Sequence, residues 1–307
     1  MQVVDLFAGC GGFSLGFVKE GYKVSAAYDN WPSAVQCYKQ NFGHKIFDLD
    51  LSKDIKKSIS HISRWKPELI IGGPPCQDFS HAGKRKEGRN ADLTVVYARL
   101  IKRLLPTYFV MENVDRFIKS NAHNIAIRIF KSAGYGLTEE ILDASFCGVP
   151  QRRKRYFCIG HRLAKDGFIH EIISQHILKK EMTVREYLGN ELGIEHYYRH
   201  PRNYNRRGIY SIDEPSPTVR GVNRPVPKGY KGHSGDPIPI SADLRPLTTM
   251  ERARIQTFPE EFHWNYISKT DLEQLIGNSV PVNLAQFVAR MLKIYIQQSK
   301  KRRDSNG

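Results

Sequence analysis

Short apolar runs alternate with helix-like segments over the first 160 residues, and this alternation restricts the possible folds more than any other feature. Strands are predicted at 2–7, 23–28, 68–72, 107–111, 137–142 and 155–160. Helices are predicted between them, for example at 13–20, 32–41, 93–105 and 121–133. Alternating strands and helices are typical of βαβ units, whose strands run parallel in one sheet. We therefore expect an α/β fold with a mostly parallel, twisted sheet.

The composition and the periodicity of the sequence change after residue 165. The stretch 199–242 is rich in Pro, Gly, Asn and Arg and has little helical periodicity, which is typical of irregular or short-stranded surface structure. Helical patterns return at 248–258 and 283–296, and the second is apolar enough to pack against a sheet. The sequence therefore predicts three parts, namely a first domain at 1–165, a smaller irregular domain at 166–262, and a segment at 263–307 whose helix returns to the first domain.

The charge of the chain points to a polyanionic partner. Among its 307 residues are 47 Lys and Arg against 31 Asp and Glu, a net charge of +16. Basic residues cluster at 84–89, 152–155, 199–207 and 299–303, and such clusters attract the phosphates of DNA or RNA. A merely solvated basic surface is the alternative, and the last cluster is more typical of a frayed tail.

Other classes of protein are disfavoured by the composition. No apolar run approaches the roughly 18 residues of a membrane span, and the chain enters a core-like strand without the basic region of a signal peptide. We therefore expect a cytoplasmic protein with no membrane partner. The five cysteines are odd in number and lack metal-binding spacings, which predicts neither a disulfide framework nor a metal site.

A glycine-rich turn joins the first predicted strand to the first helix. Gly9 and Gly11 in VVDLFAGCGGFSLGF allow a ligand to approach the backbone, and the following helix N-terminus favours negative charge. Asp29 follows the second strand, where an acidic residue binds ribose hydroxyls. The dinucleotide pattern needs glycine where this chain has Ser14, so a methionine-linked adenosine is the better prediction. A tight turn without a ligand is the alternative.

Cys76 in GGPPCQ follows the predicted strand 68–72, at the edge where open α/β sheets bind ligands. The glycines and prolines before it form a stiff, specifically shaped turn. A lone cysteine is usually a small buried hydrophobe, but Glu112 also follows a strand, and Arg153 and Arg155 lie beside another. A nucleophile, a carboxyl group and guanidinium groups at one sheet edge predict a site that attacks a polar heterocycle.

Six sequence blocks share their order with a known family. The blocks DLFAGCGGFSLGF, GGPPCQDFS, ENV, QRRKR, RPLTTMERARIQTFPEEF and IGNSVPVNLA occur as in DNA cytosine-5 methyltransferases, and the chain closely resembles the compact bacterial members. The resemblance runs from residue 2 to about 292, apart from a variable region near 166–240. It implies a Rossmann-like, S-adenosylmethionine-dependent methyltransferase fold with a smaller target-recognition domain. The implied reaction is methyl transfer to C5 of a cytosine in a short duplex DNA sequence.

The resemblance also implies roles for the residues at the sheet edge. Cys76 matches the nucleophile that attacks C6 of a cytosine flipped out of the helix. Glu112 matches the acid that engages ring N3 and the exocyclic amine, whereas Arg155 matches the residue that holds O2, with Arg153 supporting the site. S-adenosylmethionine is the implied methyl donor, S-adenosylhomocysteine is the product, and no metal is needed.

The resemblance places a set of residues at the cofactor. They are Phe7, Gly9, Gly11, Asp29, Asn30, Asp50, Leu51, Pro74, Leu93, Asn278 and Val280. The first three match the methionine-side loop, Asp29 matches the ribose-binding acid, and Asp50 with Leu51 fits the adenine-contact block, for which Asp48 is an alternative. Asn30 departs from the family pattern, where an aromatic or apolar residue often follows the ribose acid. Because Trp31 comes one place later, the residue that covers the adenine face stays open.

Two further sets of residues are implied at DNA. Residues 77–90 correspond to the family's mobile loop, whose DNA-contact candidates are Gln77, Ser80, Lys84, Arg85, Lys86 and Arg89. The block DEPSPTVRG resembles the recognition-domain signature around Thr218. The arginine candidates for guanine or phosphate contacts are Arg202, Arg206, Arg207, Arg220 and Arg224. The sequence does not divide these arginines between the two roles.

The implied partners are double-stranded DNA and a cognate restriction endonuclease that acts separately, with the enzyme itself a monomer. A tRNA cytosine-5 methyltransferase of the same fold is the main alternative, although the Arg-rich insert favours duplex DNA. A catalytically inactive DNA-binding regulator is expected to lose Cys76 or Glu112, and both are present. A nicotinamide-dependent dehydrogenase is disfavoured by Ser14.

Overall fold

The computed structural model describes residues 1–75, 89–201, 203, 205–241 and 243–304. Its centre is a seven-stranded sheet in the order β3-β2-β1-β4-β5-β8-β6. The strands are β1 (Gln2–Leu6), β2 (Lys23–Asp29), β3 (Lys45–Asp48), β4 (Leu69–Gly72), β5 (Tyr108–Val114), β6 (Tyr135–Asp143) and β8 (Lys154–Arg162). The first five pair in parallel, whereas β8 runs antiparallel to both β5 and β6. The predicted α/β fold with a mostly parallel sheet is confirmed.

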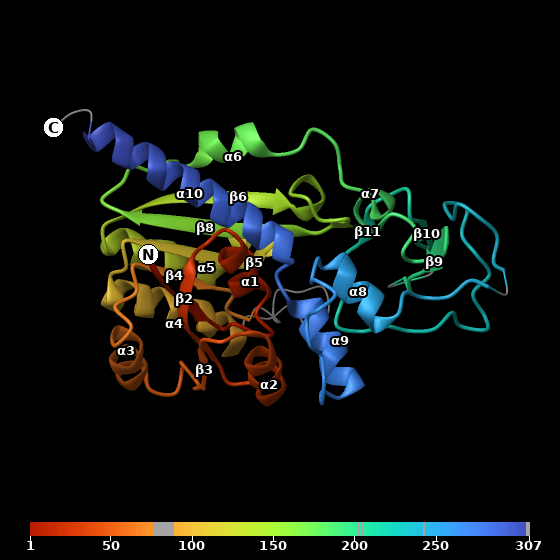
Figure 1. Ribbon diagram of the computed structural model, residues 1–307, viewed down its shortest axis with the longest axis horizontal. Helices are drawn as coiled ribbons and strands as arrows, with labels where there is room; N and C mark the ends of the chain where they lie inside the picture. Colours follow the sequence, from red (N-terminus) through yellow and green to blue (C-terminus); the bar gives the residue numbers. More distant parts are fainter. Residues whose placement is uncertain (76–88, 202, 204, 242, 305–307) are drawn as a thin grey trace.

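Helices cover both faces of the sheet (Figure 1). One face carries α1 (Gly12–Lys19), α6 (His170–His176) and α10 (Val282–Asp304), and the other carries α3 (Ile55–Ser63), α4 (Arg89–Leu104) and α5 (Asn121–Ser132). Helix α2 (Pro32–Asn41) packs beside β3. Neighbouring strand residues face opposite cores, so that Val3 belongs to the α10 side and Val4 to the α4 side. Burial on both faces explains why these strands read as continuous apolar runs.

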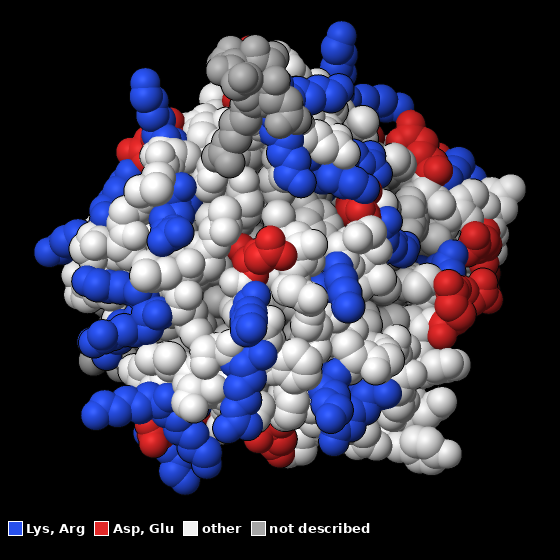
Figure 2. Space-filling model, turned by 60° about the vertical axis from the view of Figure 1, so that its left-hand side comes forward, with Lys and Arg blue, Asp and Glu red and all other residues white. Residues whose placement is uncertain are grey.

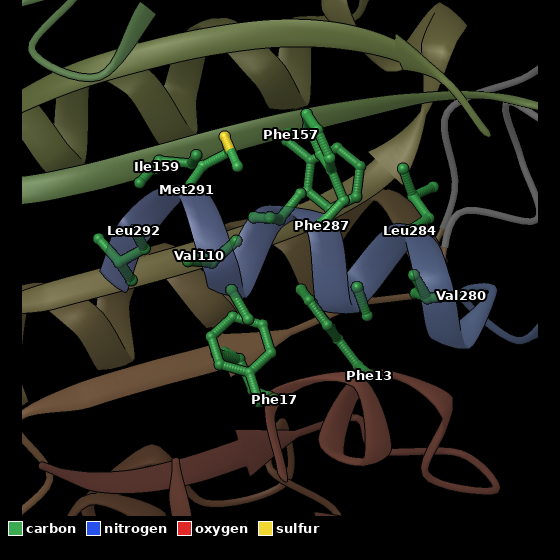
Figure 3. Close-up of a cluster of buried hydrophobic side chains, with 14 of the residues drawn as sticks. Phe13, Phe17, Val110, Phe157, Ile159, Val280, Leu284, Phe287, Met291 and Leu292 are labelled. Atoms are coloured by element: carbon green, nitrogen blue, oxygen red, sulfur yellow. The ribbon is translucent and has the colours of Figure 1, made fainter. Parts of the chain in front are cut away.

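The long helix α10 lies across the sheet and meets α1 there (Figure 3). Phe287 and Met291 of α10 belong to the same buried cluster as Phe157 of β8 and Phe17 of α1. The two helices approach closely at Gly16, where an added Cβ would lie 2.6 Å from the backbone nitrogen of Gln286. The helix continues to Asp304, beyond its predicted range of 283–296. The prediction ended too early because the sequence after 296 is polar and lacks the apolar pattern.

A smaller lobe lies to the right of the sheet in Figure 1. It contains α7 (Val184–Leu188) and the short strands β9 (His196–Tyr198), β10 (Ile209–Ser211) and β11 (Ser216–Pro217). Strand β11 pairs with β7 (Gln151–Arg152), which directly precedes β8, and this pairing joins the small lobe to the sheet. The chain then returns through α8 (Thr249–Ile255) and α9 (Lys269–Asn278) to α10. The domain boundaries at 165 and 262 stay predictions.

Several elements were not predicted from the sequence. They are β3, α3, α6, α7 and α9, together with the 3-10 helices η1 (Asp115–Lys119) and η2 (Ala144–Phe146). Most are short, and α3 depends on a cap in which the side chain of Asp54 accepts a hydrogen bond from the backbone nitrogen of Lys57. Within the described residues, none of the helices has the length and apolar character needed to cross a membrane.

Candidate active site

Glu112 and Arg155 form an ion pair at the carboxyl end of the parallel strands. Glu112 Oε1 lies 3.0 Å from Arg155 Nε, and both side chains are largely buried. The antiparallel register of β5 and β8 places Arg155 opposite Val114, so Arg155 is the diagonal neighbour of Glu112 on the same face. Glu112 was expected to follow its strand. It lies inside β5 instead, because the strand continues to Val114.

The turn after β4 is shaped to accept the Glu112 carboxylate. A Cβ added to Gly73 would lie 3.1 Å from Glu112 Oε2, so the residue at 73 faces the carboxylate directly. At position 72 a side chain would collide with the neighbouring strand β1, because a Cβ added to Gly72 would lie 2.6 Å from the carbonyl oxygen of Leu6. Asn113 Nδ2 donates to the Pro74 carbonyl at 3.5 Å. The GGPP turn and the ENV strand end are therefore built against each other.

Burial controls the protonation of Glu112. It raises the pKa of this carboxyl group above its usual value, and the positive charges of Arg155 and then Arg153 act in the opposite direction. Because the effect of burial is the larger one, the Glu112 carboxyl group holds a proton more readily than a solvated carboxyl group does. The arrangement can therefore donate or share a proton.

Arg153 occupies a different environment from Arg155. Its side chain is 1 % exposed and donates to backbone carbonyls, with Nη1 at 2.9 Å from Val219 O and Nη2 at 2.9 Å from Gly277 O. A third bond joins Nη2 to Ser279 O at 3.1 Å. These contacts connect the strand that bears Arg155 to the small lobe and to the turn after α9, which fits the predicted supporting role.

The glycine-rich turn is organised by Asp29. Asp29 Oδ2 accepts a hydrogen bond from the backbone nitrogen of Gly9 at 2.8 Å, and Oδ1 accepts one from that of Trp31 at 2.9 Å. Burial raises the pKa of the Asp29 carboxyl group, although these backbone hydrogen bonds act against the rise. Gly9 and Gly11 have φ angles of 57° and 93°, in the left-handed region that glycine adopts without strain. The turn and the acid predicted from their spacing are thus in direct contact.

The other predicted cofactor residues differ in exposure. Asn30 is exposed, whereas Trp31 is partly buried in the cluster that contains Phe258. Leu51 is buried, and Asp50 Oδ1 accepts hydrogen bonds from the Ser52 backbone and hydroxyl. Asp48 pairs with Asp29 across β3 and β2, and the backbone nitrogen of Leu49 donates to the Asp29 carbonyl at 3.0 Å, so the start of this block lies beside Asp29.

Four further members of that set lie in α4, in the turn after β4, at the end of α9 and in the turn that follows α9. Leu93 lies partly buried in the first turns of α4, and Pro74 is buried in the turn after β4. Asn278 is the exposed last residue of α9, and Val280 is buried in the cluster that contains α10. The backbone around these two is fixed by Arg153 and by Gln256 Nε2, which donates to Ser279 O at 3.2 Å.

A buried polar network beneath the glycine-rich turn was not predicted from the sequence. Ser14 Oγ donates to Asp5 Oδ2 at 2.7 Å, and the Tyr38 hydroxyl donates to Ser14 Oγ at 2.6 Å. Burial raises the pKa of Asp5 to about 8. Ser14 therefore replaces the glycine of a dinucleotide turn with a side chain that has a structural partner. An acidic residue inside an apolar strand, as in VVDLF, was the available signal.

The predicted DNA-contact residues divide into several groups. Arg207 forms an ion pair with Glu214, and its guanidinium lies 4.3 Å from the ring centroid of Tyr210. Thr218 Oγ1 donates to the Arg152 carbonyl at 2.8 Å, and Arg220 donates to the carbonyl of His200. Two further candidates, Arg206 and Arg224, have exposed side chains. The predictions at Cys76, Gln77, Ser80, Lys84, Arg85, Lys86 and Arg202, and the side chain of Arg89, lie outside the described residues.

The positive charge extends well beyond these residues. Figure 2, in which the left-hand side of Figure 1 comes forward, shows Lys and Arg spread across this face of the molecule, with fewer Asp and Glu. The net charge by itself therefore does not locate a nucleic-acid surface. Within the part of the chain that the structure describes, no group of three or more His, Cys, Asp or Glu residues is arranged to hold a metal ion.

Two relatives match this chain over nearly its whole length. It is 55% identical to the "Type II methyltransferase M.HindV" of Haemophilus influenzae over 292 residues, which cover 94% of this chain and 95% of the relative. It is 50% identical to the "Type II methyltransferase M.HgiDI" of Herpetosiphon aurantiacus over 301 residues, with 98% and 96% coverage.

Solved structures share the fold at lower identity. The methyltransferase Dnmt2 of S. pombe matches with a TM-score of 0.71 and 20% identity, covering 95% of this chain and 98% of that one. The methyltransferase EhMeth of Entamoeba histolytica matches with a TM-score of 0.70 and 19% identity, covering 97% and 98%. The model of the family "C-5 cytosine-specific DNA methylase" matches residues 1–294. The chain therefore belongs to the C-5 cytosine-specific DNA methylases, enzymes that methylate DNA at C5 of cytosine.

Proposed function

We propose that this enzyme transfers a methyl group from S-adenosylmethionine to a cytosine flipped out of a short duplex DNA sequence, through a covalent bond between Cys76 and C6. The observation that carries the proposal is the buried pair of Glu112 and Arg155 beside the turn that leads to Cys76. Flipping is needed because the ring atoms of a stacked cytosine cannot be reached by such a buried pair.

The chemistry follows from the charges at the site. The Cys76 thiolate attacks C6, while the Glu112 carboxyl group shares a proton with ring N3 and Arg155 holds the O2 oxygen, so that negative charge on the ring is stabilised. The raised pKa of Glu112 suits this role, because a carboxylate without a proton would repel the developing charge. C5 then accepts the methyl group, and loss of the C5 proton reforms the ring double bond and expels Cys76.

The glycine-rich turn fits the adenosine part of the cofactor. Asp29 faces the Gly9 backbone and offers a carboxylate for ribose hydroxyls, and the left-handed Gly9 and Gly11 leave room for close approach of a ligand. The cofactor supplies the activated methyl group when bound. The other cofactor residues predicted from the sequence, from Phe7 to Val280, remain part of this proposal.

The biological setting is proposed from the relatives. Both are named as Type II methyltransferases, so we propose that this enzyme protects a short sequence from a cognate restriction endonuclease that acts separately. We further propose that it acts as a monomer in the bacterial cytoplasm, on double-stranded DNA.

A mechanism-based substrate tests the proposal. Duplex DNA that contains 5-fluorocytosine cannot lose a proton from C5, so the Cys76 bond to C6 becomes permanent after methyl transfer. We expect a covalent adduct with wild-type protein and S-adenosylmethionine, and none with Cys76→Ser. The absence of an adduct and of 5-methylcytosine on any genomic DNA would contradict the proposal, and methylation of tRNA in its place would identify RNA as the substrate.

A further inference from the structure

The backbone of residues 216–220, here called the reading segment, is bound to the strand that leads to Arg155. Its first residues pair with β7 as strand β11. The backbone nitrogen of Val219 donates to Gln151 Oε1 at 2.9 Å, and its carbonyl accepts from Arg153 Nη1 at 2.9 Å. Gln151 and Arg153 are both buried, so these bonds are shielded from water. The segment therefore has a fixed position relative to the ion pair of Glu112 and Arg155.

The end of the reading segment is held from its other side as well. The carbonyl of Arg220 accepts a hydrogen bond from Arg252, whose guanidinium is buried and paired with Glu273. Directly after it, the backbone meets α9 without intervening side chains, because a Cβ added to Gly277 would lie 2.6 Å from the Gly221 Cα. The backbone at Arg220 is thus enclosed between Arg252 of α8 and the end of α9.

The Arg220 side chain extends from this fixed backbone toward the small lobe. It donates to the His200 carbonyl and lies beside a cavity of about 30 Å³. The cavity is also lined by His200, Asn223 and Arg224, and none of its lining residues is acidic. A side chain held in this way keeps its direction, and the cationic surroundings favour electronegative atoms such as the O6 and N7 of guanine.

The other predicted DNA-contact arginines of the lobe whose side chains are described are placed differently. Arg207 is engaged by Glu214 and Tyr210 inside the lobe. Arg206 and Arg224 are exposed on segments outside helices and strands. Reading a base edge requires a planar guanidinium at a fixed position, whereas a contact to a phosphate tolerates a mobile side chain.

We propose that Arg220 reads a guanine of the target sequence through its O6 and N7 atoms, and that Arg206 and Arg224 contact DNA phosphates. This assignment rests on the proposed action on duplex DNA. It further specifies which arginine recognises a base of the target sequence. The rigid connection through Gln151 and Arg153 would keep this guanine at a constant spacing from the cytosine that is methylated.

The test compares variants of the full-length enzyme on matched duplexes. The target sequence is first identified by mapping 5-methylcytosine in genomic DNA treated with wild-type enzyme. The ratio of kcat/KM between the target and each single-base variant is then measured for wild type, Arg220→Lys and Arg224→Gln. For Arg220→Lys we expect the discrimination at one G·C pair to fall by about 5- to 100-fold, with the other positions unchanged. For Arg224→Gln we expect Kd to rise equally for every duplex and the slope of log Kd against log salt to fall by about 1.

A substituted base tests the contact without changing the protein. Replacing the guanine with 7-deazaguanine removes the N7 acceptor, which we expect to weaken wild-type kcat/KM at one position and to have no further effect on Arg220→Lys. Wild-type enzyme that tolerates 7-deazaguanine at every guanine would overturn the proposal, as would an equal loss by Arg220→Lys on all duplexes. Failure of wild type to methylate DNA would instead contradict the proposed function.

Discussion

Arg155 Nε lies 3.0 Å from Glu112 Oε1, and the two residues come from antiparallel neighbours, β8 and β5. The reversal of β8 brings its first residues to the edge where the parallel strands end. A guanidinium group from the start of one strand thereby meets a carboxyl group near the end of another. The role of this ion pair can therefore be tested by substituting Glu112 and by measuring activity as a function of pH.

Glu112→Gln is expected to remove proton sharing with the target base while keeping the size of the side chain. General acid and base catalysis contributes typically about 10²- to 10⁴-fold, so kcat should fall within that range. Since burial raises the Glu112 pKa, the wild type should lose activity as the pH rises through that raised value. Measured kcat/KM from pH 5 to pH 10 should show this alkaline decline in wild type and not in Glu112→Gln. A variant with the same decline would contradict the assignment.

Gly73→Ala is expected to affect activity more than stability. The added methyl group would lie 3.1 Å from Glu112 Oε2 and displace the carboxylate by a few tenths of an ångström. Because even a 1 Å misplacement costs roughly 10²-fold, we expect a loss in kcat of about 3- to 30-fold. Gly43→Ala is the matched control, since its added Cβ would have no neighbour within 4 Å among the described atoms. Equal kcat values for the two variants would contradict the prediction.

Asp5 makes the stability of the fold depend on pH. Its pKa is about 8 in the folded chain and close to 3.8 when solvated, so the folded state retains a proton that the unfolded state has lost. Stability should therefore decrease as the pH rises from about 4 to about 8, by up to ~1.4 kcal/mol per pH unit, and level off above that. Asp5→Asn removes this ionisation. Urea unfolding of both proteins at pH 5, 6.5 and 8 should show a flatter curve for the variant, and parallel curves would contradict the prediction.

Arg153→Met is expected to destabilise the joint between the two lobes. It leaves the carbonyls of Val219 and Gly277 without their donor, and the carbonyl of Ser279 keeps only its hydrogen bond from Gln256 Nε2. An unsatisfied buried polar group costs about 1–3 kcal/mol, so we expect a loss of about 3 kcal/mol or more in the free energy of unfolding. Arg116→Met, at an exposed site on η1, is the control. Urea unfolding provides the measurement, and a loss below about 1 kcal/mol would contradict the structural role, since surface changes stay within about 0.5 kcal/mol.

Asp29→Ala is expected to weaken cofactor binding. It removes a carboxylate that also orders the backbone of Gly9 and Trp31. Hydrogen bonds to charged groups contribute about 1.5–3 kcal/mol, which corresponds to a rise in Kd of roughly 10- to 150-fold. Calorimetric titration with S-adenosylhomocysteine measures the change, with Asp48→Ala as the comparison at the neighbouring strand position. A larger effect at Asp48 would transfer the ribose role to that residue.

Local patterns predicted the elements that have strong periodicity or special turn residues. The apolar runs at 2–7 and 68–72 became the parallel strands β1 and β4, because burial on both sheet faces requires continuous apolar sequence. Strand β3 was missed because its four residues are too few to show a periodic pattern, and α9 was missed although Ser268 caps its first turn. Strand β5 was predicted to end before Glu112, because a charged residue inside a strand carries no local sign of its distant partner.

The sequence by itself determined the family, the α/β fold, and the identity of Cys76, Glu112, Arg155 and Asp29 as candidate site residues, because motifs and periodicities are local properties of the chain. The resemblance gave Arg155 and Arg153 different expected roles, and only the tertiary structure decided which groups their side chains contact. Arg153 meets the carbonyl of Val219 66 positions away and that of Gly277 124 positions away, while Arg155 pairs with Glu112. Contacts between such distant residues are set by the way the two lobes and α9 pack together, and residue type alone does not encode them.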